Sequence, residues 1–566
     1  MPHRAREIPT IGDPHHIEAA IPTTDFTVLD RADHLLESPP GRKYPYLRDS
    51  SSSVAMTQHL DDSDAMLPPD SLSGTSTAFT NFDPLEAIPS LLEAVSPEPR
   101  TKPSHPPFFQ SVDRFSRRSH RVLGSLGVIA ITFFVVCGGP VGTEPIVAAG
   151  GPVVAIITLL LYPILVTMPY AYVIAELTTA FPEDGGFVVW VLNAFGPFWG
   201  FQVGYWCWIS GLFYTALLPS FILKIVIQYA HLDIDSSLTK YFIQAAIAVV
   251  LCFPTFFGTV SVQRSCVALL GLVLVPAILF VLWGYAASDN WGALSQIRHV
   301  DEGEIGLTGP VDIDWNTLLN MLFWRFDGIN MAAVFGSEVA NPTRIYPTAI
   351  KITVGLTMAT YIFPMTAAVV ISDPHWSTYV ADSYIATAMS IGGRVLEKLT
   401  IFTSVCGVAG LALAGLFAHA TQVCGMADCK LLPSSLAERH RRFDAPHIAI
   451  ATTLCATLML LAVEWDHLLP VANVFACGTH LIIMVAAIRL RRFLPFIPRP
   501  TQAPGGIWCI ALVTLVPIGL MGFLVFYALQ KLVTALLIAF LLVPGLLYGT
   551  YQQCRSDGEA SPVMFA

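Results

Sequence analysis

Residues 121–149 read RVLGSLGVIAITFFVVCGGPVGTEPIVAA. Val122 to Val136 is almost wholly apolar, and residues 137–145 then place three glycines, two prolines and the carboxylate of Glu144 where the bilayer midplane would lie. Glycine and proline weaken the helical hydrogen-bond ladder, since one lacks a side chain and the other lacks an amide donor. In hydrocarbon, freed backbone groups are tolerated only where protein covers them or where they line a polar cavity. An interrupted span with an acid beside the break predicts the binding site of a secondary transporter.

The composition also indicates a membrane protein. Of the 566 residues, 54% are hydrophobic and 13% are charged, and the mean hydropathy is +0.60. A soluble protein carries about 25% charged residues. No basic stripe suggests a nucleic-acid partner, the 11 cysteines lack metal-ligand spacing, and the apolar runs hold no nucleophile–base cluster. We therefore expect neither an enzyme nor a bound metal or other cofactor.

Three parts are expected along the chain. Residues 1–112 are rich in Pro, Ser, Asp and Glu and cannot bury enough apolar surface to fold, which predicts a disordered cytoplasmic tail. Residues 113–552 are predicted to form an all-α, polytopic transporter domain, and residues 553–566 a short cytoplasmic tail. Twelve spans are expected, near residues 122–149, 152–178, 197–230, 239–258, 265–287, 315–340, 347–371, 395–424, 446–463, 467–488, 506–528 and 532–551.

Lysine and arginine in the loops predict the orientation. With the N-terminus inside, the cytoplasmic segments carry 15 of these residues and the external segments carry five. Because basic loops favour the cytoplasmic side, both termini are predicted to be cytoplasmic and the acidic loop 289–314 external. We expect a multi-pass protein of the plasma membrane, surrounded by lipid.

The sixth predicted span repeats the feature of the first. FWRFDGINMAAVFGSEVANP (residues 323–342) carries Arg325, Asp327 and Glu338 in an otherwise apolar segment that glycines weaken. Spans one and six hold corresponding positions in two halves of five spans each. Interrupted helices at corresponding positions are typical of an inverted repeat.

Five motifs lie between or within these spans: GGPVGTEP (138–145), PEDGGFVVWV (182–191), ALLPSF (216–221), SEVANPTRIYPTAI (337–350) and the linker GMADCKLLP…FDAP (425–446). They resemble the amino acid–polyamine–organocation (APC) superfamily and, within it, the eukaryotic polyamine transporters of plants and protozoan parasites. The similarity covers roughly residues 115–495. The resemblance implies a LeuT-like fold of five plus five inverted spans with two added helices, substrate at the breaks in spans one and six, and proton coupling. PEDGGFVVWV is further predicted to enter an amphipathic interfacial helix.

Asp327 is the first candidate for binding a cation. It lies in FDGIN (residues 326–330), which matches a YDGWN-like element of related amino acid exchangers, where the acid faces a cationic substrate; Asn330 completes this element. An unpaired charge at such depth costs at least about 2.5 kcal/mol, so Asp327 is not expected to face lipid. The alternative is that Asp327 pairs with Arg325, although residues two apart on a helix point to different sides.

Glu144 is the second candidate. In amino acid carriers, backbone N–H groups at the span-one break hold the substrate carboxylate, an anion site at a helix start. Here Pro140 removes one donor and Glu144 adds a negative charge, and both changes favour an ammonium group. With Asp327 at the other end of one cavity, Glu144 would suit a flexible diamine, or else it caps the second half-helix. The predicted substrate site includes the glycines of this break: Gly138, Gly139 and Gly142.

Other side chains are expected around this site and at a gate. Cation–π contacts or ordinary helix packing are the alternatives for the aromatic candidates Tyr205, Trp208, Tyr214, Phe323 and Trp324. The resemblance implies that acids at the ends of spans two and six lie near a cytoplasmic gate, where they act in gating or proton coupling with basic partners. These acids are Glu176 and Glu338, and their expected partners are Arg344 and Lys351. His419 and His480 are either proton carriers or packing residues.

The leading hypothesis is a proton-linked importer of small polyamine cations such as putrescine and spermidine, working by alternating access. One alternative is a carrier of cationic or neutral amino acids, against which Pro140 and Glu144 argue. The other is a transport-like nutrient sensor that signals through its long tail.

Overall fold

The computed structural model describes residues 121–301, 304–306, 309–462 and 465–560. The predicted tail, residues 1–112, lies outside the described residues. The described residues are helical except for connecting turns and one antiparallel hairpin of strands β1 (His299–Asp301) and β2 (Glu304–Gly306). The sequence patterns did not predict this hairpin, which lies in the loop between the fifth and sixth expected spans.

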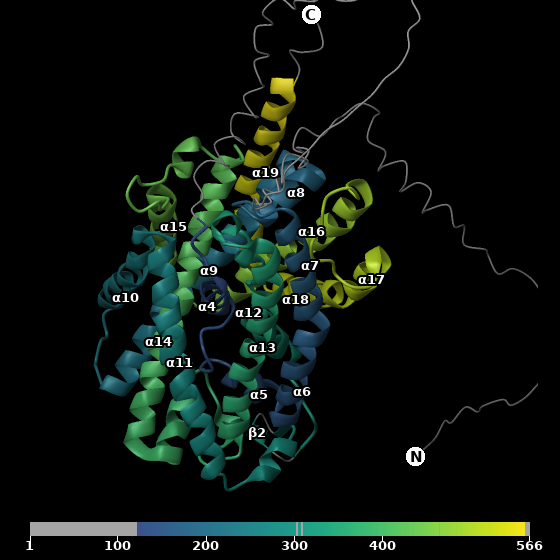
Figure 1. The fold of residues 1–566 in the computed structure, drawn as a ribbon. Helices are drawn as coiled ribbons and strands as arrows, with labels where there is room; N and C mark the ends of the chain where they lie inside the picture. Colours follow the sequence, from purple (N-terminus) through teal and green to yellow (C-terminus); the bar gives the residue numbers. More distant parts are fainter. Residues whose placement is uncertain (1–120, 302–303, 307–308, 463–464, 561–566) are drawn as a thin grey trace, which may run out of the picture. The chain divides into compact units, whose positions relative to one another are not determined.

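The helices run side by side as a bundle (Figure 1). In chain order, the α-helices are α4 (Ser125–Val136), α5 (Glu144–Gly150), α6 (Pro152–Tyr162), α7 (Met168–Ala180), α8 (Phe187–Phe195), α9 (Pro197–Ala230), α10 (Ser237–Cys252), α11 (Thr259–Ala286), α12 (Trp315–Phe326), α13 (Pro342–Val369), α14 (Ser383–Asp428), α15 (His447–Leu460), α16 (Trp465–Phe493), α17 (Gly506–Val513), α18 (Leu515–Gln530) and α19 (Leu532–Ala560). The last helix therefore continues past residue 552, where the cytoplasmic C-terminal tail was predicted to begin.

Nine helices within the described residues are long and apolar enough to cross a membrane: Pro152–Ala180, Pro197–Ala230, Ser237–Phe257, Thr259–Ala286, Pro342–Val369, Ser383–Asp428, Leu468–Phe493, Gly506–Gln530 and Leu532–Ser556. They correspond to nine of the twelve predicted spans. The other three predicted spans contain the two interrupted helices and α15, which has 14 residues. Each helix in these three spans is too short to cross the membrane alone, because a continuous helix needs about 20 residues to cross the hydrocarbon core.

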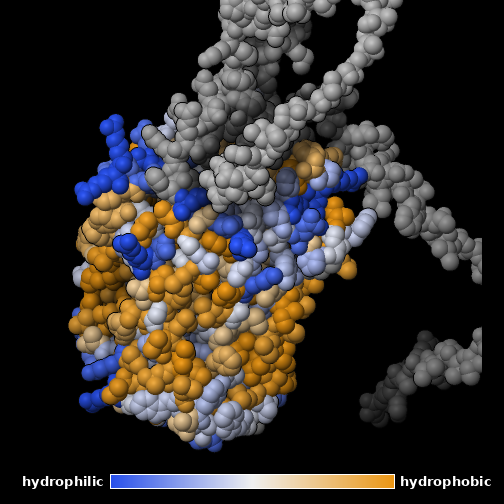
Figure 2. Space-filling model, in the orientation of Figure 1, coloured by the Kyte–Doolittle hydropathy of each residue, from blue (hydrophilic) through white to orange (hydrophobic). Residues whose placement is uncertain are grey.

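A broad apolar band covers the face shown in Figure 2, with hydrophilic residues gathered beyond its two ends. Many large apolar side chains are exposed there and elsewhere on the helices; Val275, Phe540 and Trp508, for example, are 68%, 73% and 84% exposed. Contiguous apolar surface on this scale requires a hydrocarbon environment. The chain is an all-α, polytopic membrane protein.

The predicted break in span one is confirmed. Helix α4 ends at Val136, the backbone is extended at Cys137, and α5 begins only at Glu144. Between the two helices, Gly139 and Gly142 adopt φ values of 92° and 93°, which side chains other than glycine's rarely allow.

The break in span six is also present, and it lies against the first break. Helix α12 ends at Phe326, and Asp327 is extended. Gly328 then has a φ of 102° and leads into the 3₁₀ turn η4 (Ile329–Ala333). A Cβ atom at Gly328 would lie 2.8 Å from the carbonyl oxygen of Val135 in the last turn of α4. The two interruptions are therefore packed together, so groups freed at either break are within reach of the other span.

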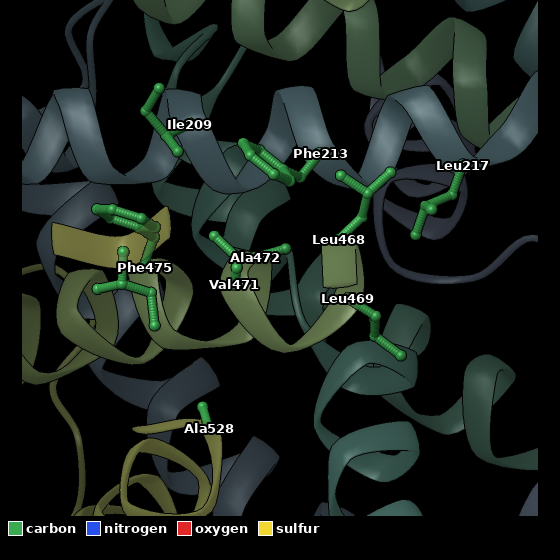
Figure 3. Packing of buried hydrophobic residues seen from close by; sticks show 10 residues of the cluster. Ile209, Phe213, Leu217, Leu468, Leu469, Val471, Ala472, Phe475 and Ala528 are labelled. Atoms are coloured by element: carbon green, nitrogen blue, oxygen red, sulfur yellow. The ribbon is translucent and has the colours of Figure 1, made fainter. Parts of the chain in front are cut away.

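Helix α9 is held firmly against α16 (Figure 3). Ile209, Phe213 and Leu217 of α9 belong to one buried cluster with Leu468 and Phe475 of α16. Between helices in a membrane, such contacts stabilise through close packing, because lipid tails are as apolar as leucine. This packing fixes the faces of α9 and α16 that carry the polar residues described below.

Helix α8 differs from the predicted interfacial helix. Seven of its nine residues are buried, and Phe187, Val188 and Trp190 have no exposed surface. It packs against α9 and α16. Its sequence, FVVWVLNAF, carries no charge and a single polar side chain, Asn193, so most of the helix surface is suited to packing against other helices.

Candidate functional site

A cavity of about 60 Å³ lies where the two breaks meet. It has room for several water molecules. Its walls come from α4, α9, α12 with the following break, α14 and α16, so every wall depends on the packing described above. The polar or ionisable lining residues are Cys207, Ser210, Tyr214, Thr215, Arg325, Asp327, Asn330, His419, Thr479 and His480.

Asp327 carries the carboxylate of this cavity. As the residue directly after α12, it accepts a hydrogen bond from the Gly328 amide through Oδ1, at 2.6 Å. The same oxygen lies 2.8 Å from Nε2 of His480, with the side chains of Asp327 and His480 only 11% and 8% exposed. Among the described residues Nε2 makes no aligned hydrogen bond, so the two groups meet in a close contact, which is an ion pair only when both His480 nitrogens carry protons. Asp327 therefore pairs with His480 and not, as the alternative reading had it, with Arg325.

Aromatic rings hold His480 in place. Its ring stacks on Tyr170 of α7 at 4.2 Å between centroids, and Phe323 of α12 lies at 5.5 Å. A side chain held by ring contacts loses less freedom when it pairs, which favours the contact with Asp327. The sequence left His480 as either a proton carrier or a packing residue and did not relate it to Asp327, because nothing local connects residues 327 and 480.

Arg325 brings a positive charge to the same cavity. Its Nη2 donates to the carbonyl oxygen of Gly142 in the span-one break at 2.5 Å, and its guanidinium lies 4.5 Å from the Trp324 ring centroid. Among the described residues, no carboxylate lies within ion-pair distance of Arg325. A freed backbone carbonyl and an aromatic face thus compensate this buried charge. The contact with Gly142 also ties the two breaks together.

Replacing Gly142 with alanine should destabilise the protein by about 1–2 kcal/mol, the usual cost of holding a side chain at positive φ. The new Cβ would also lie 2.0 Å from Nη2 of Arg325 and displace it from the break. Thermal unfolding of the purified protein measures the loss. Gly271→Ala is the matched control, since a Cβ there meets nothing within 4 Å. Equal unfolding temperatures for the two variants would contradict the structural role of Gly142.

Three of the predicted substrate residues line the cavity: Trp324, Asp327 and Asn330. Asn330 is buried, and its Nδ2 lies 3.7 Å from the Cys207 sulfur, while its Oδ1 has no hydrogen-bond partner among the described residues. Trp324 stacks on Tyr214 at 6.2 Å, and the Tyr214 hydroxyl donates to Asn473 at 2.7 Å. Aromatic and polar side chains therefore line the same cavity as Asp327.

Glu144 does not share the cavity with Asp327. It is fully buried, and its carboxylate accepts hydrogen bonds from the amides of Gly142 and, at 3.3 Å, Tyr384. The expected arrangement, with the two acids at opposite ends of one cavity, is therefore not the one observed. The geometry matches the alternative of a carboxylate at a helix start, where freed N–H groups and the helix dipole favour a negative charge.

The remaining predicted substrate residues also lie off the cavity lining. Tyr205 donates from its hydroxyl to the Leu541 carbonyl in α19 at 2.8 Å, and Trp208 donates to Thr453 at 3.4 Å. Phe323 contacts the site only through the His480 ring. The glycines of the break, Gly138, Gly139 and Gly142, form its backbone without lining the cavity. Ordinary helix packing, the alternative left open for the aromatic residues, accounts for Tyr205 and Trp208.

The predicted gate acids pair with other arginines than expected. Glu176 accepts from Nε of Arg491 at 2.8 Å and from the Ala503 amide at 2.9 Å, and it also pairs with Arg499. Arg344 is exposed on α13, and Lys351 lies 5.5 Å from the Tyr172 ring centroid. The partners of Glu176 come from the end of α16 and the connection after it, segments that the sequence did not relate to span two.

Arg439 joins three segments at the end of the bundle that is predicted to be cytoplasmic. Its Nη2 lies 2.9 Å from Asp184 of the turn after α7, and its Nη1 lies 3.3 Å from Glu338 after the break in span six. Asp184 also accepts from the Ser337 amide at 3.2 Å. Leu123 exchanges backbone hydrogen bonds with Glu338 and Ala340, which adds the start of span one to this Arg439 cluster.

The sequence is similar to one protein family and to several individual transporters. A family model described as "Amino acid permease" matches residues 123–547. "Polyamine transporter PUT1" of Oryza sativa subsp. japonica is 30% identical over 399 residues, which are 70% of this chain and 72% of that protein. "Polyamine transporter RMV1" of Arabidopsis thaliana is 28% identical over 440 residues, 77% of this chain and 85% of that protein. "Uncharacterized transporter Rv1999c" of Mycobacterium tuberculosis is 26% identical over 279 residues, 48% of this chain and 58% of that protein.

Proposed function

Because this chain belongs to the amino acid permease family, we propose that it is a secondary active transporter that imports polyamines such as putrescine and spermidine. It is a transporter and not an enzyme. The proposal includes twelve spans in a LeuT-like arrangement of five plus five with two added, alternating access, proton coupling, and a plasma membrane location with cytoplasmic termini. The two packed breaks support this arrangement, since substrates of such folds bind at broken helices near the bilayer midplane.

The single observation that carries the substrate class is the position of Asp327. Its carboxylate lines the cavity between the two breaks. A buried carboxylate binds an organic ammonium group through charge-assisted hydrogen bonds. The curated relatives named as polyamine transporters support the same class.

Glu144 has no part in this proposal as a second anchor, because it lies off the cavity. A diamine would therefore bind one ammonium at Asp327, with its second ammonium among neutral acceptors such as the free Oδ1 of Asn330. Only one end of the diamine would then form an ion pair, whereas the two-anchor arrangement predicted from the sequence has an ion pair at each end.

One observation favours the alternative of an amino acid carrier. Arg325 places a guanidinium on the cavity that also holds Asp327. An amino acid could then direct its carboxylate to Arg325 and its ammonium to Asp327. The two functions differ in whether the substrate binds through the positive charge of Arg325.

Uptake into vesicles reconstituted with the full-length protein tests the proposal. With labelled putrescine and an imposed proton gradient, unlabelled putrescine and spermidine should compete at least tenfold better than arginine or leucine. Faster carriage of arginine or leucine than of putrescine would overturn the polyamine assignment and favour the amino acid carrier. If the vesicles carry neither class, a sensor is favoured, and removal of residues 1–112 should then abolish its signal.

Arg325→Gln separates the two substrate classes further. Removal of the guanidinium should leave diamine affinity unchanged or improve it, because a like charge is lost from the cavity. For an amino acid substrate, the same change should cost about tenfold or more in affinity, since a charge-assisted hydrogen bond contributes about 1.5–3 kcal/mol. The measurement is competition by each substrate against wild type and variant. A tenfold loss of putrescine affinity in Arg325→Gln would contradict the diamine model.

A further inference from the structure

The pair of Asp327 and His480 unites the predicted cation anchor with a group that can carry a proton. Nε2 of His480 lies 2.8 Å from Oδ1 of Asp327. Both side chains line the same cavity, so a substrate that reaches Asp327 must approach His480 as well. Histidine is the side chain whose charge changes in the physiological pH range.

The surroundings of His480 leave Asp327 as its charged partner. Tyr170 of α7 stacks on the ring, and Phe323 of α12 lies in a tilted contact with it. The other ionisable residues that line the cavity are Cys207 and Tyr214 of α9, Arg325 of α12 and His419 of α14. Cys477 of α16 directly follows the lining residue Ala476. Phenol and thiol groups stay neutral at physiological pH, and Arg325 stays charged. Among the described residues, only Asp327 lies within ion-pair distance of His480.

We propose that a proton on His480 and the ammonium group of the substrate compete for Asp327, so that cation binding releases the His480 proton. This rests on the proposed function, since it requires a cationic substrate. Because proton and substrate exclude one another at Asp327, the proton coupling it gives is an exchange of the two and not their joint transport. Protonated His480 is the resident counter-charge of Asp327. When an ammonium group arrives, two cations would share one carboxylate at about 3 Å, and their repulsion favours loss of the proton. The proton passes from Nε2 to water in the cavity, and His480 becomes neutral. Asp327 keeps one positive partner, which is now the ammonium group of the substrate.

Competition for one carboxylate fixes the sign of the pH dependence. Because proton and substrate compete for one carboxylate, substrate affinity weakens as pH falls. As pH rises, the competition disappears and affinity reaches a plateau. For exchange of one proton, the dissociation constant changes by at most about tenfold per pH unit, and by reciprocity about one proton leaves per cation bound.

Isothermal titration of purified full-length protein in nanodiscs with putrescine tests this. The titrations are made at pH 5.5, 6.5, 7.5 and 8.5, each in two buffers of different ionisation enthalpy, which measures proton release directly. Wild type should show a dissociation constant that rises severalfold per pH unit below neutrality and release of up to one proton. His480→Gln, which keeps a polar donor and removes the charge, should bind with a flat pH profile and release none.

His419→Gln is the matched control, because His419 lines the same cavity but its Nδ1 faces Gln422 at 3.2 Å. It should keep the wild-type pH slope. His480→Lys provides a second variant if His480→Gln does not fold, since a permanent charge at this place should weaken putrescine binding at least tenfold at every pH. A wild-type profile without a slope, or a slope that survives in His480→Gln, overturns the competition.

The outcomes separate this inference from the proposed function. If putrescine binds without proton release, the polyamine assignment stands and the role of His480 fails. If putrescine does not bind but another cation from the uptake panel does, the assignment fails and the same titrations with that cation decide the role of His480. Failure of every cation to bind overturns both.

Discussion

Asp327→Asn should weaken putrescine binding by roughly 10- to 100-fold, with a similar amount of folded protein in the membrane. Asparagine keeps the shape of the side chain and can still accept the Gly328 hydrogen bond, but it removes the negative charge. A hydrogen bond to a charged group contributes about 1.5–3 kcal/mol, and each 1.4 kcal/mol is tenfold in affinity. The measurement is the concentration dependence of labelled putrescine uptake, normalised to protein at the cell surface.

Glu144→Gln is the informative comparison for Asp327. Because the Glu144 carboxylate is bound by backbone amides away from the cavity, this variant should lower stability and reduce uptake of diamines and monoamines alike. A selective loss of diamines in Glu144→Gln would restore the two-anchor arrangement that the sequence suggested. Near wild-type affinity in Asp327→Asn would remove Asp327 from the site.

Arg439→Ala should lower the free energy of unfolding by about 3–5 kcal/mol, the range measured when one partner of a buried ion pair is removed. The Asp184 and Glu338 side chains are 8% and 10% exposed and would be left without their shared cation. Arg439→Lys should recover only part of the loss, because a lysine cannot reach two carboxylates with a planar fork. Thermal unfolding of the purified protein measures each change.

Arg441→Ala is the control for Arg439, since Arg441 lies in the same linker and is exposed. Surface substitutions of this kind usually change stability by less than about 0.5 kcal/mol. If Arg439→Ala unfolds at the same temperature as Arg441→Ala, the Arg439 cluster does not stabilise this end of the protein. A normal unfolding temperature together with a changed transport rate would instead assign the cluster to gating alone.

The interruptions at residues 137–143 and 327–328 were predictable because they depend on local backbone chemistry. Gly139, Gly142 and Gly328 adopt positive φ values in the structure, and glycine tolerates these whatever surrounds it. The apolar runs also marked the helices, since burial of backbone groups in lipid requires them to be hydrogen-bonded within a helix. Apolar runs alone overestimate the length of continuous helix in three of the predicted spans. Two of these spans are broken, after α4 and after α12, and the third holds only the short helix α15.

The burial of α8 against other helices was not predictable, for a related reason. Apolar composition is the same for a side chain that faces lipid and for one that faces another helix. Phe187 and Trp190 are buried by α9 and α16, while Trp508 on α17 is 84% exposed, yet all three are large aromatic residues in apolar stretches. Hydropathy measures removal from water, and it does not distinguish the two environments.

Residue types and their spacing were enough to predict that the chain crosses a membrane many times, that spans one and six are broken, and that an acid lies beside each break. These properties depend on residue type and on spacing along one helix. Helix packing established that Asp327 pairs with His480, that Glu144 binds backbone amides off the cavity, and that Glu176 and Glu338 pair with Arg491 and Arg439. Each of these contacts joins groups far apart in the chain, and which of them meet depends on the faces that packed helices turn toward one another.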